Sequence, residues 1–292
     1  MNILVTGATG FVGRNLIAEL RKCNTVFAVV RNPQDLECLG LQGFVINGDV
    51  QKLKKYIESN GIDGVIHLAA MCVVHHDSSQ IGELISSNIT FGTMILEAAC
   101  SVATVKWFIN TGSIWQNFNS IGNVYNPVNL YAATKEAFID IAKYYTEVSK
   151  IKFCTLKLCD CYGPEDRRGK ILSLLKDSIN SEKILYLTPG EQKIDILYIT
   201  DVVKGFIHLI HMISSDLEIK SEYVLSAGYF LTLREIVSIF EKKVGKSLNV
   251  KWGGKQYRFR EVMSPWIGEQ LPGWHPDISI SEGISMFLKA KD

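Results

Sequence analysis

The feature that most constrains the fold is the glycine-rich stretch TGATGFVG at residues 6–13, which follows a short apolar run at the start of the chain. Gly7, Gly10 and Gly13 allow a tight turn and a close approach of the backbone to a bound group. The apolar run predicts a strand before the turn. Residues 12–22 predict a helix after it, whose N-terminal N–H groups would face an anion. This arrangement indicates a dinucleotide site. The residues expected to contact the cofactor here are Gly7, Gly10, Phe11 and Val12.

Short apolar runs rich in β-branched residues alternate with longer helical stretches over the first part of the chain. The predicted strands are residues 3–5, 25–30, 43–46, 64–68, 106–110 and 153–158, and the clearest predicted helices are 12–22, 84–103 and 130–150. Strands with so few polar positions suit a parallel sheet that is buried on both faces. The order of elements therefore predicts an α/β fold with a doubly wound parallel (Rossmann) sheet.

After about residue 160 the alternation becomes irregular. Gly163-Pro164 begins a charged turn, and short helical and strand patterns then lead to a segment rich in Trp, Gly and Pro at 251–276. We expect residues 1–160 to form the dinucleotide-binding domain, which also receives parts of about 191–213. Residues 161–292 would mainly form a smaller, mixed α/β domain that binds substrate.

The composition narrows the possible functions. With 31 Lys and Arg against 30 Asp and Glu, the chain lacks the bulk charge that attracts nucleic acid or acidic membranes. Seven scattered cysteines without a CxxC pair indicate neither a disulfide framework nor a zinc site, and the adjacent His75 and His76 would point in different directions. No leader pattern precedes the first strand, and no apolar run approaches the roughly 20 residues that span a bilayer. We expect a cytoplasmic protein without a metal.

The end of the second predicted strand distinguishes between nicotinamide cofactors. NAD-binding proteins usually place Asp or Glu there, where it binds the ribose hydroxyls. This chain has Arg31 directly after Val30, and its next acidic residue is Asp35. A guanidinium fork suits the oxygens of a 2′-phosphate, whereas the alternative is an arginine that is merely solvated. We therefore predict NADP(H), with Arg31 at the 2′-phosphate.

Tyr131 and Lys135 form a Y-x-x-x-K pair at the start of a predicted helix. Residues four apart lie on one helical face, so the ammonium would lie near the phenol. A phenol titrates near ~10, and we expect the ammonium to lower that pKa so that Tyr131 can exchange a proton with a sugar hydroxyl or ketone. Ser113, which follows a predicted strand, completes a candidate catalytic group.

Together these motifs resemble the extended short-chain dehydrogenase/reductase family, which includes nucleotide-sugar epimerases, dehydratases and reductases. The matching stretches are TGATGFVG, NGDV at 47–50, VIHLAA at 65–70, FINTGS at 108–113, YAATK at 131–135, LKLCDCYGP at 156–164 and ILYITDVVKG at 196–205. The resemblance implies a catalytic triad of Ser113, Tyr131 and Lys135. It also implies that Asp49 and Val50 flank the adenine, and that the cofactor contacts Leu68, Ala69 and Ala70.

One position departs from the family pattern. Gly92-Thr93 resembles the family's asparagine-glycine-threonine stretch, but Asn88 precedes Gly92 by four residues rather than the usual three. The resemblance still implies an active-site role for Asn88, at a spacing one residue longer than that of the family.

The two positions after Ser113 bear on the type of reaction. The related 4,6-dehydratases have an Asp-Glu pair there, which supplies the acid and base that remove water. Here those positions are Ile114 and Trp115, which cannot transfer a proton. Two reactions remain: reversible oxidation with return of the hydride, as in a 4-epimerase, and net reduction of a ketone. A reductase must exchange its cofactor and uses NADPH, so Arg31 favours net reduction.

The run at 113–138 is similar to that of the abequose and paratose synthases, which reduce the C4 ketone of CDP-activated 3,6-dideoxyhexoses for surface polysaccharides such as O-antigen. The resemblance implies a CDP-4-keto-deoxyhexose substrate, and a homodimer formed through the helices at 84–103 and 130–150. The alternatives are an NAD-dependent 4-epimerase of the same fold and a non-catalytic dinucleotide sensor or assembly subunit. The predicted substrate ligands are Trp115, Gln116, Asn117, Asp160, Lys170 and Arg258.

Overall fold

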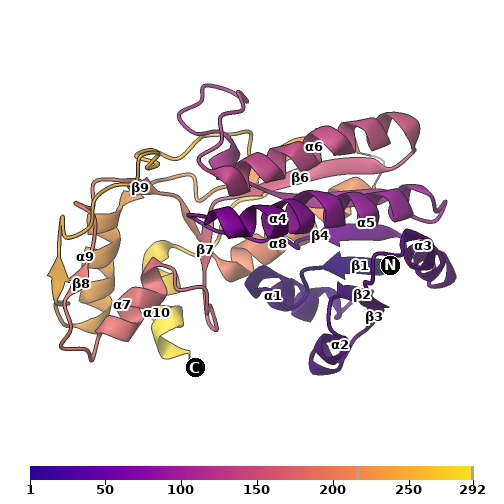
Figure 1. Ribbon diagram of the computed structural model, residues 1–292. Coiled ribbons are helices and arrows are strands. Elements are labelled where there is room, and N and C mark those ends of the chain that lie inside the picture. The colour runs from indigo at the N-terminus through magenta and orange to yellow at the C-terminus, as the bar shows by residue number, and fades with distance from the viewer. Residues whose placement is uncertain (216, 291–292) are drawn as a thin grey trace.

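A parallel sheet of seven strands forms the centre of the computed structural model, which describes residues 1–215 and 217–290 (Figure 1). Its spatial order is β11-β6-β5-β4-β1-β2-β3, and every neighbouring pair is parallel. The strands are β1 (Asn2–Thr6), β2 (Thr25–Val30), β3 (Gln42–Val45), β4 (Gly64–His67), β5 (Trp107–Ser113), β6 (Lys152–Leu158) and β11 (Glu222–Leu225). Because the chain order reverses between β1 and β4, the sheet is doubly wound, and the predicted fold class is confirmed.

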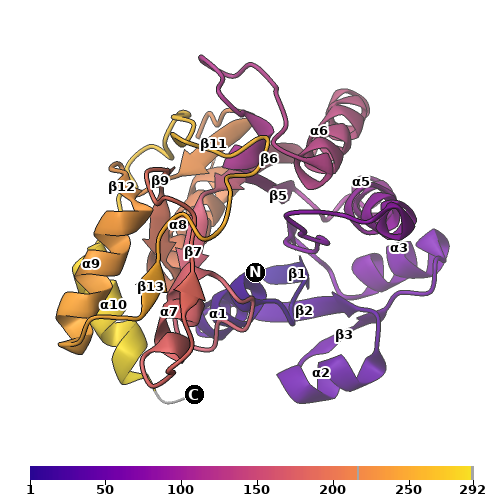
Figure 2. The same ribbon diagram turned by 60° about the vertical axis from the view of Figure 1, so that its left-hand side comes forward.

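Helices cover both faces of this sheet, as Figure 2 shows. One face packs against α3, α5 and α6, with Leu53, Ile95 and Phe138 in its core. The other face packs against α1 and α8, with Leu16 and Phe206 in its core. The helices of this part are α1 (Phe11–Leu20), α2 (Pro33–Leu39), α3 (Val50–Ser59), α4 (Ile81–Ile85), α5 (Phe91–Cys100), α6 (Leu130–Val148) and α8 (Ile199–Ser214). Burial on both faces explains why the strand residues Ile3, Leu4 and Val5 are all apolar.

The helix predicted at 84–103 differs from the structure in one respect. It runs from α4 into α5 through a π-helical turn, η2 (Ser86–Thr90). A π turn accommodates one extra residue within a helix, and such turns are frequent at functional sites. The turn contains Asn88, the residue whose spacing to Gly92 is one longer than the family pattern.

Smaller elements beside the C-terminal edge of the sheet form the second part of the molecule (Figure 2). They are η1 (Ser78–Gln80), η3 (Ile114–Gln116), β7 (Asp160–Tyr162), α7 (Ile171–Ser178), β8 (Leu185–Tyr186), β9 (Lys193–Ile194), β10 (Ile196–Tyr198), β12 (Leu231–Thr232), α9 (Leu233–Val244), β13 (Val250–Lys251) and α10 (Ile280–Lys289). Three strand pairs, β7–β10, β8–β13 and β9–β12, connect them. The chain returns from this part to the large sheet as α8 and β11. The strand β11 was not among the predicted strands, and the division at residue 160 stays a prediction.

In the described residues, no helix combines the length and the apolar character needed to cross a membrane.

Candidate active site

The turn between β1 and α1 has the geometry of a cradle for a large anion. Gly7 has a φ of 70°, and a Cβ at this position would lie 2.6 Å from the backbone nitrogen of Ala69. A Cβ on Gly13 would lie 2.2 Å from the carbonyl oxygen of Gly7. Only glycine fits either position. Because these residues have no Cβ, the backbone of the turn can lie close to an anion bound at the end of the sheet.

The N-terminus of α1 is open to such an anion. Within residues 1–215, no side chain caps Gly10, the N-cap residue, and no acidic residue lies in the first helical turn. Helix N-terminal N–H groups without partners bind phosphate favourably. Phe11 is buried beneath the turn and Val12 is partly buried. The predicted pyrophosphate site therefore fits this end of α1.

A buried polar chain holds the loop after β4 against this turn. The hydroxyl oxygen of Thr6 accepts a hydrogen bond from the Ala69 N–H at 3.2 Å and lies 2.8 Å from His67 Nδ1. Burial, with the Lys135 ammonium nearby, lowers the pKa of His67 to about 3, so the ring is neutral. These hydrogen bonds hold Leu68, Ala69 and Ala70 at the same edge of the sheet as Gly7.

The other predicted cofactor residues follow β2 and β3. Arg31 is exposed directly after β2, and within the described part of the chain no hydrogen bond, ion pair or ring contact engages its guanidinium. Asp49 caps α3, its carboxylate accepting the Lys52 N–H at 3.0 Å, and Val50 is the first residue of that helix. The carboxyl ends of parallel strands meet at one edge of a sheet, so Arg31 is available to a ligand there. The adenine contacts of Asp49 and Val50 stay predictions.

The candidate catalytic residues lie at the same edge. Asn129 caps α6 by accepting the Ala132 N–H at 3.0 Å, and this cap positions Tyr131 and Lys135 in the first two turns, both buried. Ser113 is the last residue of β5 rather than a loop residue, and its hydroxyl accepts the Trp115 N–H at 3.3 Å. The rings of Trp115 and Tyr131 meet edge to face, 6.4 Å between centroids. The structure therefore brings the three predicted residues to one site.

The pKa of Tyr131 moves in the opposite direction to the prediction. Burial, reinforced by the neighbouring thiol of Cys72, raises the pKa of Tyr131 well above 10, and the Lys135 ammonium does not offset it. Burial also lowers the pKa of Lys135 to about 8. The cofactor-free site thus holds Tyr131 as a protonated phenol, which can donate a proton but is a poor base.

The depressed pKa of Lys135 predicts a pH dependence of stability. Its pKa is near 10.4 when unfolded and about 8 when folded, so the unfolded chain binds more protons between these values. The cost of burying the charge is fully present below pH 8 and disappears as the pH rises through 10.4. Between pH 7 and pH 9 we expect the free energy of unfolding, measured in urea without cofactor, to rise by about 1 kcal/mol relative to a Lys135→Met variant. Parallel pH profiles of the two proteins would contradict this.

Asn88 secures the floor of the site through the π turn. Its side chain is fully buried, accepts the Met71 N–H at 2.7 Å and donates to the carbonyl oxygen of Met71 at 3.0 Å. It also donates to the hydroxyl of Thr134 at 2.9 Å, between Tyr131 and Lys135 on α6. The extra residue of the π turn thus lets Asn88 bridge the loop after β4 and the catalytic helix.

Two thiols near Tyr131 were not predicted as site residues. The thiol of Cys72 interacts electrostatically with the Tyr131 hydroxyl. Cys161, on β7, is buried, interacts electrostatically with Tyr131, and lies 3.6 Å from Nη2 of Arg168. The only sequence signal for them was their position, Cys72 two residues after VIHLAA and Cys161 within LKLCDCYGP.

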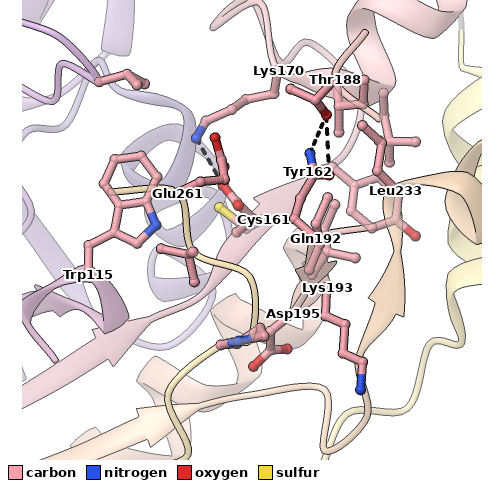
Figure 3. A pocket seen from close by; sticks show the side chains of 18 of the residues that line it. Trp115, Cys161, Tyr162, Lys170, Thr188, Gln192, Lys193, Asp195, Leu233 and Glu261 are labelled. Carbon is pink, nitrogen blue, oxygen red and sulfur yellow. Dashed lines mark hydrogen bonds and ion pairs between the residues drawn. The ribbon is translucent and has the colours of Figure 1, made fainter. Parts of the chain in front are cut away.

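A cavity of about 270 Å³ lies between the edge of the sheet and the smaller elements (Figure 3). Trp115, Cys161 and Lys170 gather at one end of it, and Thr188, Gln192 and Leu233 lie at the other. Four of the predicted substrate ligands line this cavity: Trp115, Asp160, Lys170 and Arg258.

Gln116 and Asn117, also predicted as substrate ligands, do not face the cavity, and the structure corrects their placement. Both side chains are buried. Gln116 accepts the Ser113 N–H and donates to Glu136, so it closes the capping box of η3. Asn117 accepts from Lys157 and donates to the carbonyl of Val124. All the polar side-chain atoms of both residues are thus engaged within the protein. The two amides stabilise the loop behind Trp115 and do not bind substrate.

Two cations of the cavity, Lys170 and Arg258, are paired with carboxylates. Lys170 Nζ lies 2.9 Å from Asp160 Oδ1, and the Arg258 guanidinium binds both carboxylate oxygens of Glu261. Lys170 Nζ and the Arg258 guanidinium carbon lie 5.7 and 5.6 Å from the ring of Trp115. Glu261, which the sequence did not suggest, therefore belongs to the cavity as the partner of Arg258.

A doubly wound sheet with an open helix N-terminus at its switch point, beside a tyrosine–lysine pair, defines a dinucleotide-binding enzyme of the Rossmann class. The comparisons with known proteins agree. Residues 3–223 match the model of the NAD dependent epimerase/dehydratase family, and the chain belongs to that family.

Curated relatives cover nearly the whole chain. CDP-abequose synthase of Yersinia pseudotuberculosis is 30% identical over 91% of this chain and 92% of its own length. UDP-glucuronate 4-epimerase of Thermodesulfobacterium geofontis is 25% identical over 96% of this chain and 93% of its own. Among solved structures, MoeE5 in complex with UDP-glucuronic acid and NAD has a TM-score of 0.82 at 22% identity, over 99% of this chain and 98% of its own. The structural likeness supports the fold.

Proposed function

We propose that this protein reduces the C4 ketone of a nucleotide-activated 3,6-dideoxy-4-ketohexose, CDP being the favoured nucleotide, with NADPH as reductant. The observation that carries the proposal is the surface around the Tyr131 hydroxyl. It includes the Trp115 ring and the thiols of Cys72 and Cys161, which offer few hydrogen bonds to sugar hydroxyls. Such a surface suits a ring that lacks hydroxyls at C3 and C6. The 30% identity to a CDP-abequose synthase over most of both chains supports the same choice.

The residues divide the chemistry between them. NADPH, when bound at the glycine turn and Arg31, supplies the hydride to C4. Tyr131, protonated because its pKa is raised, donates its proton to the developing alkoxide. Ser113 hydrogen-bonds the same oxygen and orients the carbonyl. Lys135 stabilises the phenolate that remains and binds the nicotinamide ribose. Ile114 and Trp115 offer no acid or base, so elimination of water has no catalyst there.

A 4-epimerase is the second candidate, because the UDP-glucuronate 4-epimerase of Thermodesulfobacterium geofontis matches 96% of this chain and 93% of its own length. The two reactions differ in their use of cofactor. The purified protein would be mixed with NADPH and an enzymatically prepared CDP-3,6-dideoxy-4-ketohexose, and the loss of reduced-cofactor absorbance followed. Oxidation that depends on the sugar supports the reductase. An absence of oxidation, together with NAD retained through purification and interconversion of sugar epimers, would establish the epimerase instead.

The predicted choice of NADP(H) rests on Arg31. Replacing it with Asp removes the cation and places a carboxylate where the 2′-phosphate would bind. We expect the ratio of the Kd values for NADPH and NADH, measured by fluorescence titration, to shift toward NADH by about 100-fold. Arg21→Asp makes an equal change of charge at the C-terminal end of α1 and should leave the ratio of the two Kd values unchanged. A ratio that is equal in all three proteins would refute the role of Arg31.

We also propose that the protein acts in the cytoplasm as a homodimer through α4, α5 and α6. Exposed apolar side chains on α4 and α6 support that interface: Ile81, Ile85, Tyr144 and Val148.

A further inference from the structure

The ion pair between Asp160 and Lys170 lies at the catalytic end of the cavity. Both side chains are about one-third exposed, 36% and 33%, on the cavity that they line. Lys170 Nζ lies 5.7 Å from the Trp115 ring, and that ring meets the edge of Tyr131. A sugar whose C4 is within reach of the Tyr131 hydroxyl must therefore lie beside this pair.

The charges of the pair cancel at neutral pH. Burial acts to raise the pKa of Asp160, but the Lys170 ammonium, assisted by Arg168 and Arg258, holds that pKa below its usual range. Asp160 in turn raises the pKa of Lys170 despite burial. Both groups are thus ionised, and each satisfies the other.

The second cation on the Trp115 ring is not free either. Arg258 binds Glu261 through its Nε and Nη2, and its backbone N–H also donates to Glu261. Lys193 and Lys255 also line the cavity, but in the described residues the cations over the Trp115 ring are Lys170 and Arg258, and Lys193 lies well away from Lys170 in Figure 3. A carboxylate entering beside Trp115 would therefore lose its hydration without gaining a free cation, and would meet the charge of Asp160.

We propose that the Asp160–Lys170 pair selects uncharged sugars and excludes uronic acids from this site. The proposal rests on the proposed function, since it concerns the sugar of a bound nucleotide sugar. It assigns to Asp160 a role in specificity that does not depend on the reaction catalysed. A relative named for an acidic sugar shows that the distinction arises within the family. Removing the charge of Asp160 would release Lys170 to bind a sugar carboxylate.

The test compares the binding of neutral and acidic sugars on the same nucleotide. CDP-glucose, CDP-glucuronic acid, UDP-glucose and UDP-glucuronic acid are titrated by calorimetry into protein saturated with NADP⁺. For the nucleotide that binds, we expect the wild type to prefer the glucose derivative by at least about tenfold. Asp160→Asn should reduce this preference by about tenfold or reverse it.

Asp195→Asn is the matched control. Asp195 lines the same cavity and its carboxylate accepts the Ala227 N–H, so the substitution removes one negative charge, frees no cation beside Trp115 and leaves the Asp160–Lys170 pair intact. It should therefore keep the ratio of the two affinities. A fall in the ratio as large as that of Asp160→Asn would show that total charge, not this pair, decides, and would overturn the proposal.

The ratio in the wild type tests the proposal without any variant. Equal binding of the two derivatives by the wild type overturns it, as does a preference that Asp160→Asn leaves unchanged. In either case the reductase stands if the ketohexose still oxidises NADPH. If neither glucose derivative binds and no ketohexose is reduced, the proposed function is wrong and the inference falls with it.

Discussion

Replacing Tyr131 with Phe should lower kcat for reduction of the CDP-ketohexose by about 10²- to 10⁴-fold, the usual contribution of a general acid. The substitution removes only the hydroxyl that would protonate the alkoxide. The ring keeps its edge-to-face contact with Trp115, so the affinity for NADPH and the melting temperature should remain close to those of the wild type. Steady-state loss of NADPH absorbance measures the first quantity, and fluorescence titration and circular dichroism measure the others.

Tyr144→Phe is the matched control for that variant. Tyr144 lies on the same helix, with 63% of its surface exposed, and it is not a residue of the site. Its kcat should equal that of the wild type. Full turnover by Tyr131→Phe would show that the proton comes from elsewhere, and the assignment of the catalytic acid would have to be abandoned.

Gly7→Ala should lower the free energy of unfolding by about 2–4 kcal/mol. About 1 kcal/mol arises because alanine disfavours a φ of 70°. A further 1–3 kcal/mol arises because the new Cβ meets the backbone of Ala69 at 2.6 Å and that of Leu68 at 2.8 Å, and backbone cannot turn aside as a side chain can. Urea unfolding monitored by circular dichroism measures the loss. NADPH affinity should fall as well, since the turn must shift.

Gly40→Ala separates the two contributions. Gly40 has a similar φ, 57°, but a Cβ there would meet nothing within 4 Å. It should lose only about 1 kcal/mol. Equal losses in the two variants would mean that the contact with the loop after β4 contributes nothing to stability.

The sequence predicted the fold and the catalytic group because both depend on local patterns. A buried parallel strand is apolar throughout, a glycine turn joins it to a helix, and Tyr131 and Lys135 are one helical turn apart. The strand β11, Glu222–Leu225, escaped prediction because it lies after residue 160, where the regular alternation of strands and helices that marked the other strands has ended.

The parts of the site that could not be predicted depend on contacts between distant segments. Lys170 and Arg258 were predicted as substrate ligands, but Asp160 and Glu261 pair with them, and the two pairs gather around Trp115, which is distant in the sequence. Gln116 and Asn117 look like sugar ligands in a polar loop, yet Glu136 and Lys157 engage them from other elements. The pKa of Tyr131 was misjudged because burial outweighs the ammonium, and the depth of burial is a property of the tertiary fold.

The position of β11 has a consequence for how the protein folds during its synthesis. This strand pairs with β6 at the edge of the main sheet, although 63 residues of chain separate the end of one from the start of the other. A ribosome that has released β6 has made six of the seven strands, but the sheet still presents an unpaired edge, which is a template for unwanted pairing. The intervening smaller elements must emerge before that edge can close. The β6 edge therefore stays open to pairing with another chain until Leu225 has left the exit tunnel.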